Sequence, residues 1–126
     1  MVVSVEVIEH VEDPALFLAQ LSRIARQGMS LSSPNWTGSR CNWPYHLREY
    51  TPKEFFEVLS PHGKVTLFKG TSDGCEVFRI KYPAIHFLQN RLRVFPVTAL
   101  PMRCLNVILP SESRIHSSNA AWVAFG

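Results

Sequence analysis

Two glutamates and a histidine lie together at the end of the first apolar segment of the chain. They are Glu6, Glu9 and His10, and they close the run over residues 2–8. An imidazole titrates near neutral pH and can take a proton from a hydroxyl or an amine. Carboxylate and imidazole ligands also suit Mg, Mn or Zn. The alternative is that Glu9 and His10 only satisfy the backbone of a loop.

A second group of polar side chains lies in the loop expected over residues 34–50. His46 is a candidate base, and Arg48 can pair with Glu49 or with a carboxylate or phosphate of a substrate. An ion pair that only fixes the loop is the simpler interpretation of Arg48 and Glu49. Such a density of aromatic residues indicates a lid or a pocket wall, with packing beneath the loop as the alternative. These aromatic residues are Trp36, Trp43, Tyr45 and Tyr50.

The elements that position the first group form a strand–helix–strand unit. Residues 2–8 are apolar and β-branched, which is typical of a parallel strand with helices over both faces of its sheet. Asp13 caps a helix over residues 14–28, and Glu12 and Asp13 complement the dipole of that helix. Residues 29–33 form a second strand. The unit places the two glutamates and the histidine at the carboxyl end of a parallel strand, where open α/β sheets bind ligands.

The segment Thr51-Pro52-Lys53-Glu54 is a capping box with proline at the first helical position, and it predicts a helix that ends before Gly63. The further elements expected are a third strand (64–68), a turn (71–74), a strand or extended arm (76–82), a helix (85–94) and a closing strand (121–125). Pro96, Pro101 and Pro110 are expected to break up the chain between that helix and the closing strand.

Composition sets wider limits on the class of protein. The chain has 126 residues, 46% of them hydrophobic and 18% charged, which indicates one globular domain and excludes a disordered tail. The apolar runs are too short to span a bilayer, and no signal peptide is present. The bases after Val58 are scattered, so we expect a solvated surface with neither nucleic acid nor a membrane as partner. Three cysteines outside any C-x-x-C pair indicate ordinary thiols and a cytoplasmic location. They are Cys41, Cys75 and Cys104.

Four segments, in order, resemble motifs of class I S-adenosylmethionine-dependent methyltransferases. They are VEVIEHVEDP (5–14, E-x-x-E-H then x-x-D-P), RIARQG (23–28, R-x-L-K-P-G), SSPN (32–35, S-T-P-N) and YHLREYT (45–51, Y-H-x-R-E-[YF]-T). The resemblance implies an α/β chain with a partial Rossmann-like methyltransferase fold, a mostly parallel sheet and flanking helices. It implies a single incomplete domain over residues 1–126, with fourth- to sixth-strand elements in 1–70 and a variable part in 71–126.

The family rests its cofactor on a G-x-G-x-G turn, because only glycine lets the backbone approach closely enough. No two of the six glycines here lie closer than four positions apart. We therefore expect a truncated chain that corresponds to the carboxyl-terminal half, without the cofactor-binding half. The strand over residues 2–8 then becomes an exposed hydrophobic edge, and we expect self-association or a partner chain that covers it.

The resemblance implies S-adenosylmethionine as cofactor and methyl transfer to a small-molecule or sugar-linked acceptor. The implied site residues are His10 and His46 as catalytic groups, Glu9, Asn35 and Arg48 as substrate contacts, and Glu6 as a cofactor contact. Similarity to ubiquinone-type O-methyltransferases adds a divalent metal, with Glu6, Glu9 and His10 as candidate ligands, although other members with the same residues need no metal. The alternative function is a non-catalytic remnant or interaction module that binds a partner through the exposed sheet edge.

Overall fold

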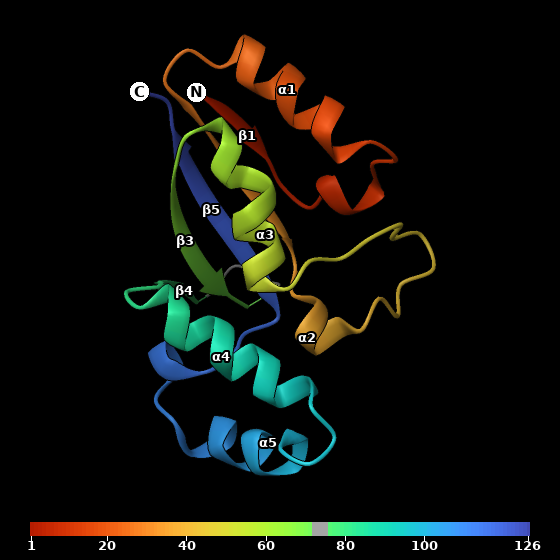
Figure 1. The fold of residues 1–126 in the computed structure, drawn as a ribbon, viewed down its shortest axis with the longest axis vertical. Helices are drawn as coiled ribbons and strands as arrows, with labels where there is room; N and C mark the ends of the chain where they lie inside the picture. The colour runs from red at the N-terminus through yellow and green to blue at the C-terminus, as the bar shows by residue number, and fades with distance from the viewer. Residues whose placement is uncertain (72–75) are drawn as a thin grey trace.

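The structure is a computed structural model that describes residues 1–71 and 76–126. Its centre is a five-stranded mixed sheet with the strand order β1-β2-β5-β3-β4 (Figure 1). The strands are β1 (Val2–Ser4), β2 (Gly28–Pro34), β5 (Ser118–Ala124), β3 (Lys64–Gly70) and β4 (Val77–Arg79). Within the described ranges β1 and β2 are the one parallel pair of neighbours, and β5 runs antiparallel to both β2 and β3. The expectation of a mostly parallel sheet is therefore wrong, because β5 returns between two strands that point the same way.

The first strand is shorter than the sequence predicts. β1 pairs with β2 through Val2, Val3 and Ser4. Glu6 then adopts a positive φ of 51°. This left-handed residue turns the chain out of the sheet and into the 3-10 turn η1 (Ile8–His10). β1 is the end strand of the sheet and Val3 is exposed, so the predicted apolar edge is present.

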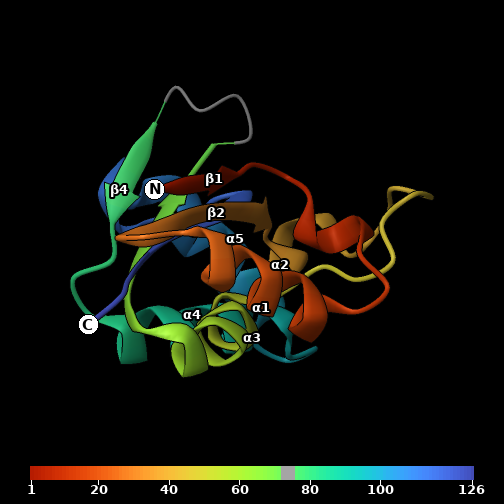
Figure 2. The ribbon, with the colours of Figure 1, turned by 90° about the horizontal axis from the view of Figure 1, so that it is seen from above.

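The long helices that pack on the sheet lie on one of its faces. Figure 2 shows α1 (Pro14–Ile24) and α3 (Pro52–Leu59) on the same side. Side chains alternate along the strands, so Met29, Leu31 and Val123 are buried under these helices, whereas Ser30 and Trp122 on the other face are half-buried. The core is completed by Leu18, Tyr50, Phe55, Leu59 and Leu67. The expectation of helices over both faces is wrong for the part of the chain that the structure describes.

Both predicted helix starts are confirmed. The Asp13 carboxylate accepts a hydrogen bond from the backbone N–H of Leu16 at 2.9 Å, and Pro14 occupies the first helical position. In α3 the Thr51 hydroxyl accepts from the backbone N–H of Glu54, and the Glu54 carboxylate accepts in return from the Thr51 N–H at 2.9 Å. Two short 3-10 turns, η2 (Ser60–His62) and η3 (Ser111–Ser113), follow α3 and α5. The predicted turn over residues 71–74 falls mostly outside the described residues.

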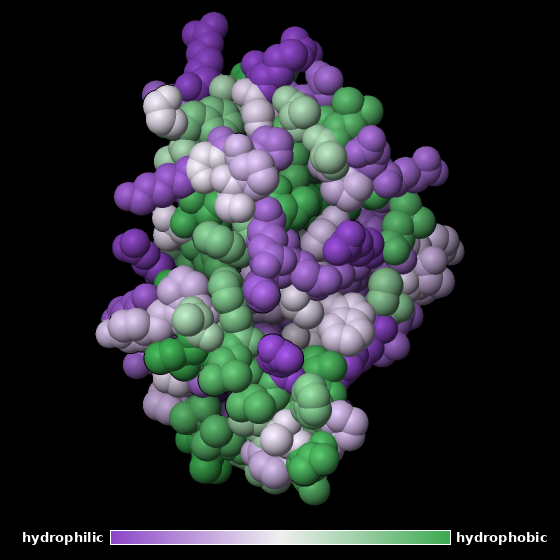
Figure 3. Space-filling model, in the orientation of Figure 1, coloured by the Kyte–Doolittle hydropathy of each residue, from purple (hydrophilic) through white to green (hydrophobic). Residues whose placement is uncertain are grey.

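Two helices follow β4 and lie beyond the end of the sheet (Figure 1): α4 (Pro83–Val94) and α5 (Ala99–Ile108). The sequence predicts α4 but not α5, because Pro101 was expected to break the chain. Pro101 is the third residue of α5, where a backbone N–H has no acceptor within the helix, so proline is tolerated there. Hydrophobic side chains gather on the surface over these two helices (Figure 3). Among the described residues, no helix combines the length and the apolar character needed to cross a membrane.

Candidate functional site

The turn η1 is fastened to the loop that follows the short helix α2 (Trp36–Ser39). The backbone N–H groups of Leu47 and Arg48 donate to the carbonyl oxygen of Glu9, at 2.8 and 3.2 Å. These two bonds bring His46 beside His10 although 36 positions separate them in the sequence. The rings lie edge to face, with centroids 4.8 Å apart and an interplanar angle of 78°.

The side chain of Glu9 is fully buried, and neither carboxylate oxygen has a hydrogen-bond partner among the described residues. Burial raises the pKa of Glu9 above its usual 4.5, and the charge of Glu6 adds to the rise, while its own backbone N–H, which makes no hydrogen bond to the carboxylate, and the charges of His10 and His46 act against it. A buried carboxylate without donors is costly in its charged form. Glu9 is therefore a group that gains from taking up a proton or a cation.

The two imidazoles are oriented so that one nitrogen of each stays available. The Nδ1 atom of His10 lies 2.9 Å from the carbonyl oxygen of Tyr45, and Nδ1 of His46 lies 2.5 Å from Oε1 of Glu49. Both partners are acceptors, so Nδ1 carries the proton in each ring and Nε2 keeps its lone pair in the neutral form. The Nε2 atom of His10 is 4.0 Å from Oε1 of Glu9. The basic nitrogen of His10 therefore lies near the buried carboxylate, and the ring of His46 lies beside that of His10.

Glu9, His10 and His46 are close enough to hold one ion, because they offer ligand atoms that all lie within 4.8 Å of one another. The candidate metal ligands inferred from the sequence were Glu6, Glu9 and His10, and the structure brings His46 to this group. The Glu6 carboxylate instead accepts a hydrogen bond from the hydroxyl of Ser32 at 2.7 Å. Carboxylate and imidazole ligands fit Zn²⁺ and similar divalent cations.

Tyr50, predicted with the other aromatic residues of the loop to form a lid or a pocket wall, belongs to the hydrophobic core. Its side chain is buried, and its hydroxyl has no hydrogen-bond partner among the described residues. Burial raises the pKa of the Tyr50 hydroxyl; the positive charge of Arg48 acts against the rise, and Glu54 and Glu9 add to it. Tyr50 and Glu9 are therefore two buried polar groups without hydrogen-bond partners in the described ranges.

Glu49 holds the loop to α2 and orients His46. Its carboxylate accepts hydrogen bonds from the Ser39 hydroxyl, from the backbone N–H of Cys41 at 3.0 Å and from His46. Burial alone would raise the pKa of Glu49, but these three hydrogen bonds together lower it. Glu49 therefore stays a carboxylate at neutral pH. It fixes the tautomer of His46 in the way that second-shell carboxylates fix metal-bound histidines.

The other predicted substrate contacts have partners within the chain. Arg48 pairs with Glu54 at 3.6 Å and lies over the ring of Tyr50, not beside Glu49. The buried amide of Asn35 donates to Oδ1 of Asn90 and to the carbonyl oxygen of His116, both at 3.0 Å. In this arrangement Asn35 ties the start of α2 to α4.

The loop does not bury all of its aromatic residues. Trp43 and Tyr45 are exposed and contact each other edge to face, so packing beneath the loop does not explain them. Cys41 and Cys104 are free thiols, as expected, and Cys75 lies outside the described residues.

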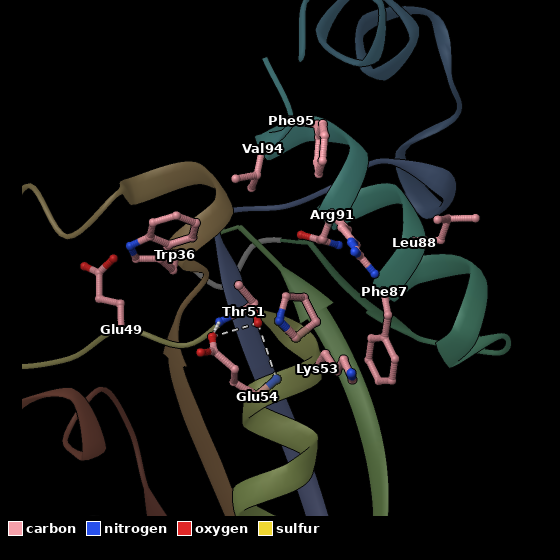
Figure 4. A pocket seen from close by; sticks show the side chains of 12 residues that line it. Trp36, Glu49, Thr51, Lys53, Glu54, Phe87, Leu88, Arg91, Val94 and Phe95 are labelled. Carbon is pink, nitrogen blue, oxygen red and sulfur yellow. Dashed lines mark hydrogen bonds between the residues drawn. The ribbon is translucent and has the colours of Figure 1, made fainter. Parts of the chain in front are cut away.

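A cavity of about 690 Å³ opens between α2, α3 and α4 (Figure 4). Trp36, Phe87 and Phe95 give it an aromatic wall, and Arg91 lines it from α4. Glu49 lines the same cavity and is hydrogen-bonded to His46, so the cavity adjoins the histidine pair. The α4 residues of this cavity were not identified from the sequence, because their contact with α3 depends on the packing of distant segments.

Comparisons with known proteins give no assignment for this arrangement. No family model, no curated protein and no solved structure matches the chain.

Proposed function

We propose that this chain forms the acceptor side of a cytoplasmic S-adenosylmethionine-dependent methyltransferase with a partial Rossmann-like fold. The observation that supports the proposal is the pair His10 and His46, each with an anchored Nδ1–H and an available Nε2, beside the buried carboxylate of Glu9. An acceptor hydroxyl or amine loses a proton as the methyl group leaves the sulfonium sulfur. An imidazole nitrogen held at that position takes the proton.

The acceptor in this proposal enters the cavity between α3 and α4. Trp36 and Phe87 provide flat apolar surfaces for a small molecule or for the ring of a sugar-linked acceptor. Arg91 is exposed on the α4 side, where it can bind a charged group of the acceptor. The hydrogen bond from His46 to Glu49 connects this binding region with the proton-accepting nitrogens.

The same residues suit a divalent cation. Glu9, His10 and His46 would be its ligands, and the carbonyl of Tyr45 and the carboxylate of Glu49 already hold the second nitrogen of each imidazole. A divalent cation, when bound, supplies Lewis-acid chemistry that lowers the pKa of an acceptor hydroxyl. In that case the histidines hold the cation in place, and the unpartnered Glu9 carboxylate gains a counter-charge.

S-adenosylmethionine is the cofactor in this proposal, and its glycine-rich turn is not found in residues 1–126. The exposed edge of β1 is the place where a further strand can pair with the sheet. We therefore place the cofactor-binding part on a segment or partner chain that covers this edge. Self-association through β1 is the other way to cover it.

Calorimetric titration with S-adenosylmethionine, together with thermal shift at millimolar ligand, tests the methyltransferase proposal. We expect weak but measurable heat and a rise in the unfolding temperature, because the acceptor side meets only part of the cofactor. The absence of both signals contradicts the proposal for this chain.

Titration with Zn²⁺ tests the cation separately. We expect Zn²⁺ to stabilise the wild type and the control variant His62→Gln, but not Glu9→Gln or His46→Gln. Equal stabilisation of all four proteins contradicts the assignment of these residues as metal ligands. The proton-accepting role of the histidines is tested separately, by the titration with S-adenosylmethionine.

A second candidate function is an interaction module without catalysis. The observation that favours it is the end strand β1, which presents an exposed Val3 and is followed by an exposed Val5. Such an apolar edge pairs readily with a strand of another chain. A Val3→Lys substitution should abolish partner binding or self-association while leaving the fold intact, which gel filtration with light scattering measures.

A further inference from the structure

The segment that contains α4 and α5 combines positive charge with exposed apolar side chains. Residues 83–110 carry Arg91, Arg93 and Arg103 and no Asp or Glu. The sequence suggests scattered bases, but the fold gathers some of them. Arg91 and Arg93 lie in the last turn of α4, Arg103 lies in α5, and the two helices contact each other.

The helix α5 turns a hydrophobic stripe toward solvent. Leu100, Cys104, Val107 and Ile108 follow the i, i+4, i+7, i+8 spacing of one helix face, and all are exposed. The exposed fraction reaches 78% at Ile108. The opposite side of α5 holds the helix to the protein, where the Asn106 side chain accepts from the backbone N–H of Ile115 at 2.6 Å.

The connection between the two helices extends this stripe. Phe95 and Val97 are exposed, and Val97 reaches 84%. We call Phe95, Val97, Leu100, Val107 and Ile108, with Arg93 and Arg103, the α5 face. Over α4 and α5 the surface is mostly hydrophobic in colour, unlike the mixed surface over α1 and α3 (Figure 3).

We propose that the α5 face docks on the surface of an anionic lipid bilayer, with α5 lying in the interface. Exposed apolar residues enter the boundary between headgroups and acyl chains, and arginines beside them contact lipid phosphates and carboxylates. This mode needs no membrane-spanning helix. It differs from the sequence expectation of no membrane partner, because the charge pattern of the α5 face forms only when α4 and α5 fold together.

Charge also argues against a second copy of the chain as the occupant. A two-fold symmetric contact places the same patch of each copy against the other. Arg93 and Arg103 of each copy would then meet a patch that carries the same positive charges, with no acidic residue in residues 83–110 to compensate. An anionic lipid bilayer offers negative headgroups to the arginines and an apolar interior to the exposed apolar side chains.

Flotation with phospholipid vesicles tests the proposal. We expect the full chain to float with vesicles of phosphatidylcholine mixed with phosphatidylserine, much less with phosphatidylcholine alone, and less as salt is added. Arg103→Gln should lower the partition coefficient on the anionic vesicles about five-fold, as expected for one basic residue near such a surface. The double variant Val107→Ser/Ile108→Ser should lower it by at least about ten-fold.

Two control variants separate this effect from a general loss of charge or apolar surface. Leu16 is exposed on α1 and Arg26 is exposed outside the α5 face, so Leu16→Ser and Arg26→Gln should bind like the wild type. Equal binding to both kinds of vesicle, or an equal loss in Leu16→Ser and in the double variant, contradicts the proposal. A concentration-dependent dimer that the double variant abolishes, without vesicle binding by the wild type, assigns the α5 face to a second copy and also overturns it. Circular dichroism confirms that each variant is folded.

Discussion

Replacing Glu9 by glutamine should make the protein more stable at neutral pH, although Glu9 lies at the centre of the candidate site. The carboxylate is fully buried and has no hydrogen-bond partner among the described residues. Its pKa is raised above 4.5, so the folded state keeps the proton at pH values where the unfolded chain has lost it. The folded state then binds more protons than the unfolded state, and the free energy of unfolding falls as pH rises from about 4.5 through the raised pKa. Glutamine keeps the shape and removes the charge.

The size of the effect follows from the burial. A buried polar group without a partner costs about 1–3 kcal/mol, and a charged group costs more. We expect Glu9→Gln to raise the free energy of unfolding at neutral pH by about 2 kcal/mol, because the neutral amide also lacks hydrogen-bond partners. For a chain of 126 residues, this gain corresponds to a rise in the unfolding temperature of roughly 6–10 °C.

The measurement is urea unfolding of the wild type and Glu9→Gln between pH 4 and pH 8, in buffer containing a chelator. Glu12, an exposed glutamate three positions away, gives the matched control Glu12→Gln, which should keep the slope of the wild type. We expect the free energy of unfolding of Glu9→Gln to depend less on pH and to exceed that of the wild type at pH 7. If Glu9→Gln is less stable than the wild type, or if its free energy of unfolding depends on pH as strongly as that of the wild type, the charged carboxylate has hydrogen-bond donors and this reasoning is refuted.

Three further predictions concern positions outside the group Glu9, His10 and His46. Burial lowers the pKa of Lys69 to about 8. Between about pH 8 and 10.5 the unfolded chain therefore binds a proton that the folded chain has lost, so the free energy of unfolding should rise with pH over that interval. Lys69→Met should make this rise smaller, as measured by urea unfolding. Gly28→Ala places a Cβ 2.4 Å from the carbonyl oxygen of Val123 and should cost roughly 3 kcal/mol in the same assay, whereas an unchanged midpoint would mean that β2 and β5 can separate. Thr51→Ala removes the cap of α3 and should cost about 1 kcal/mol, while Thr51→Ser, which retains the hydroxyl, should stay close to the wild type in thermal melts.

Local features of the fold could be predicted because neighbouring residues determine them. The caps at Asp13 and Thr51 act over three positions, and both form as the sequence indicates. The proximity of His10 and His46 was not predictable from spacing, since it depends on the hydrogen bonds that Leu47 and Arg48 make to the Glu9 carbonyl. Each histidine was a candidate because an imidazole can accept a proton, not because the two were expected to lie together.

Long-range pairing could not be predicted in the same way. Apolar alternation identifies the closing strand but does not say which strands it joins, and β5 pairs with both β2 and β3. One determinant lies in a buried side chain, because Asn119 on β5 donates to the carbonyl oxygen of Tyr50 at 2.8 Å. The helix α5 was not predicted because the sequence alone does not distinguish a proline in the first turn of a helix from a proline that ends one.

The central position of β5 has a consequence for the order in which the protein can fold. Among the strands of residues 1–71 and 76–126, Ser118–Ala124 is synthesised after the other four, yet this segment fills the gap between β2 and β3. Until it emerges, β3 and β4 have only each other to pair with, and β1 and β2 form a separate two-stranded piece, neither of which is stable alone. A premature stop a few codons before Ser118 therefore removes the middle of the sheet, not its margin. Until β5 has been made, the facing edges of β2 and β3 have no strand between them to pair with.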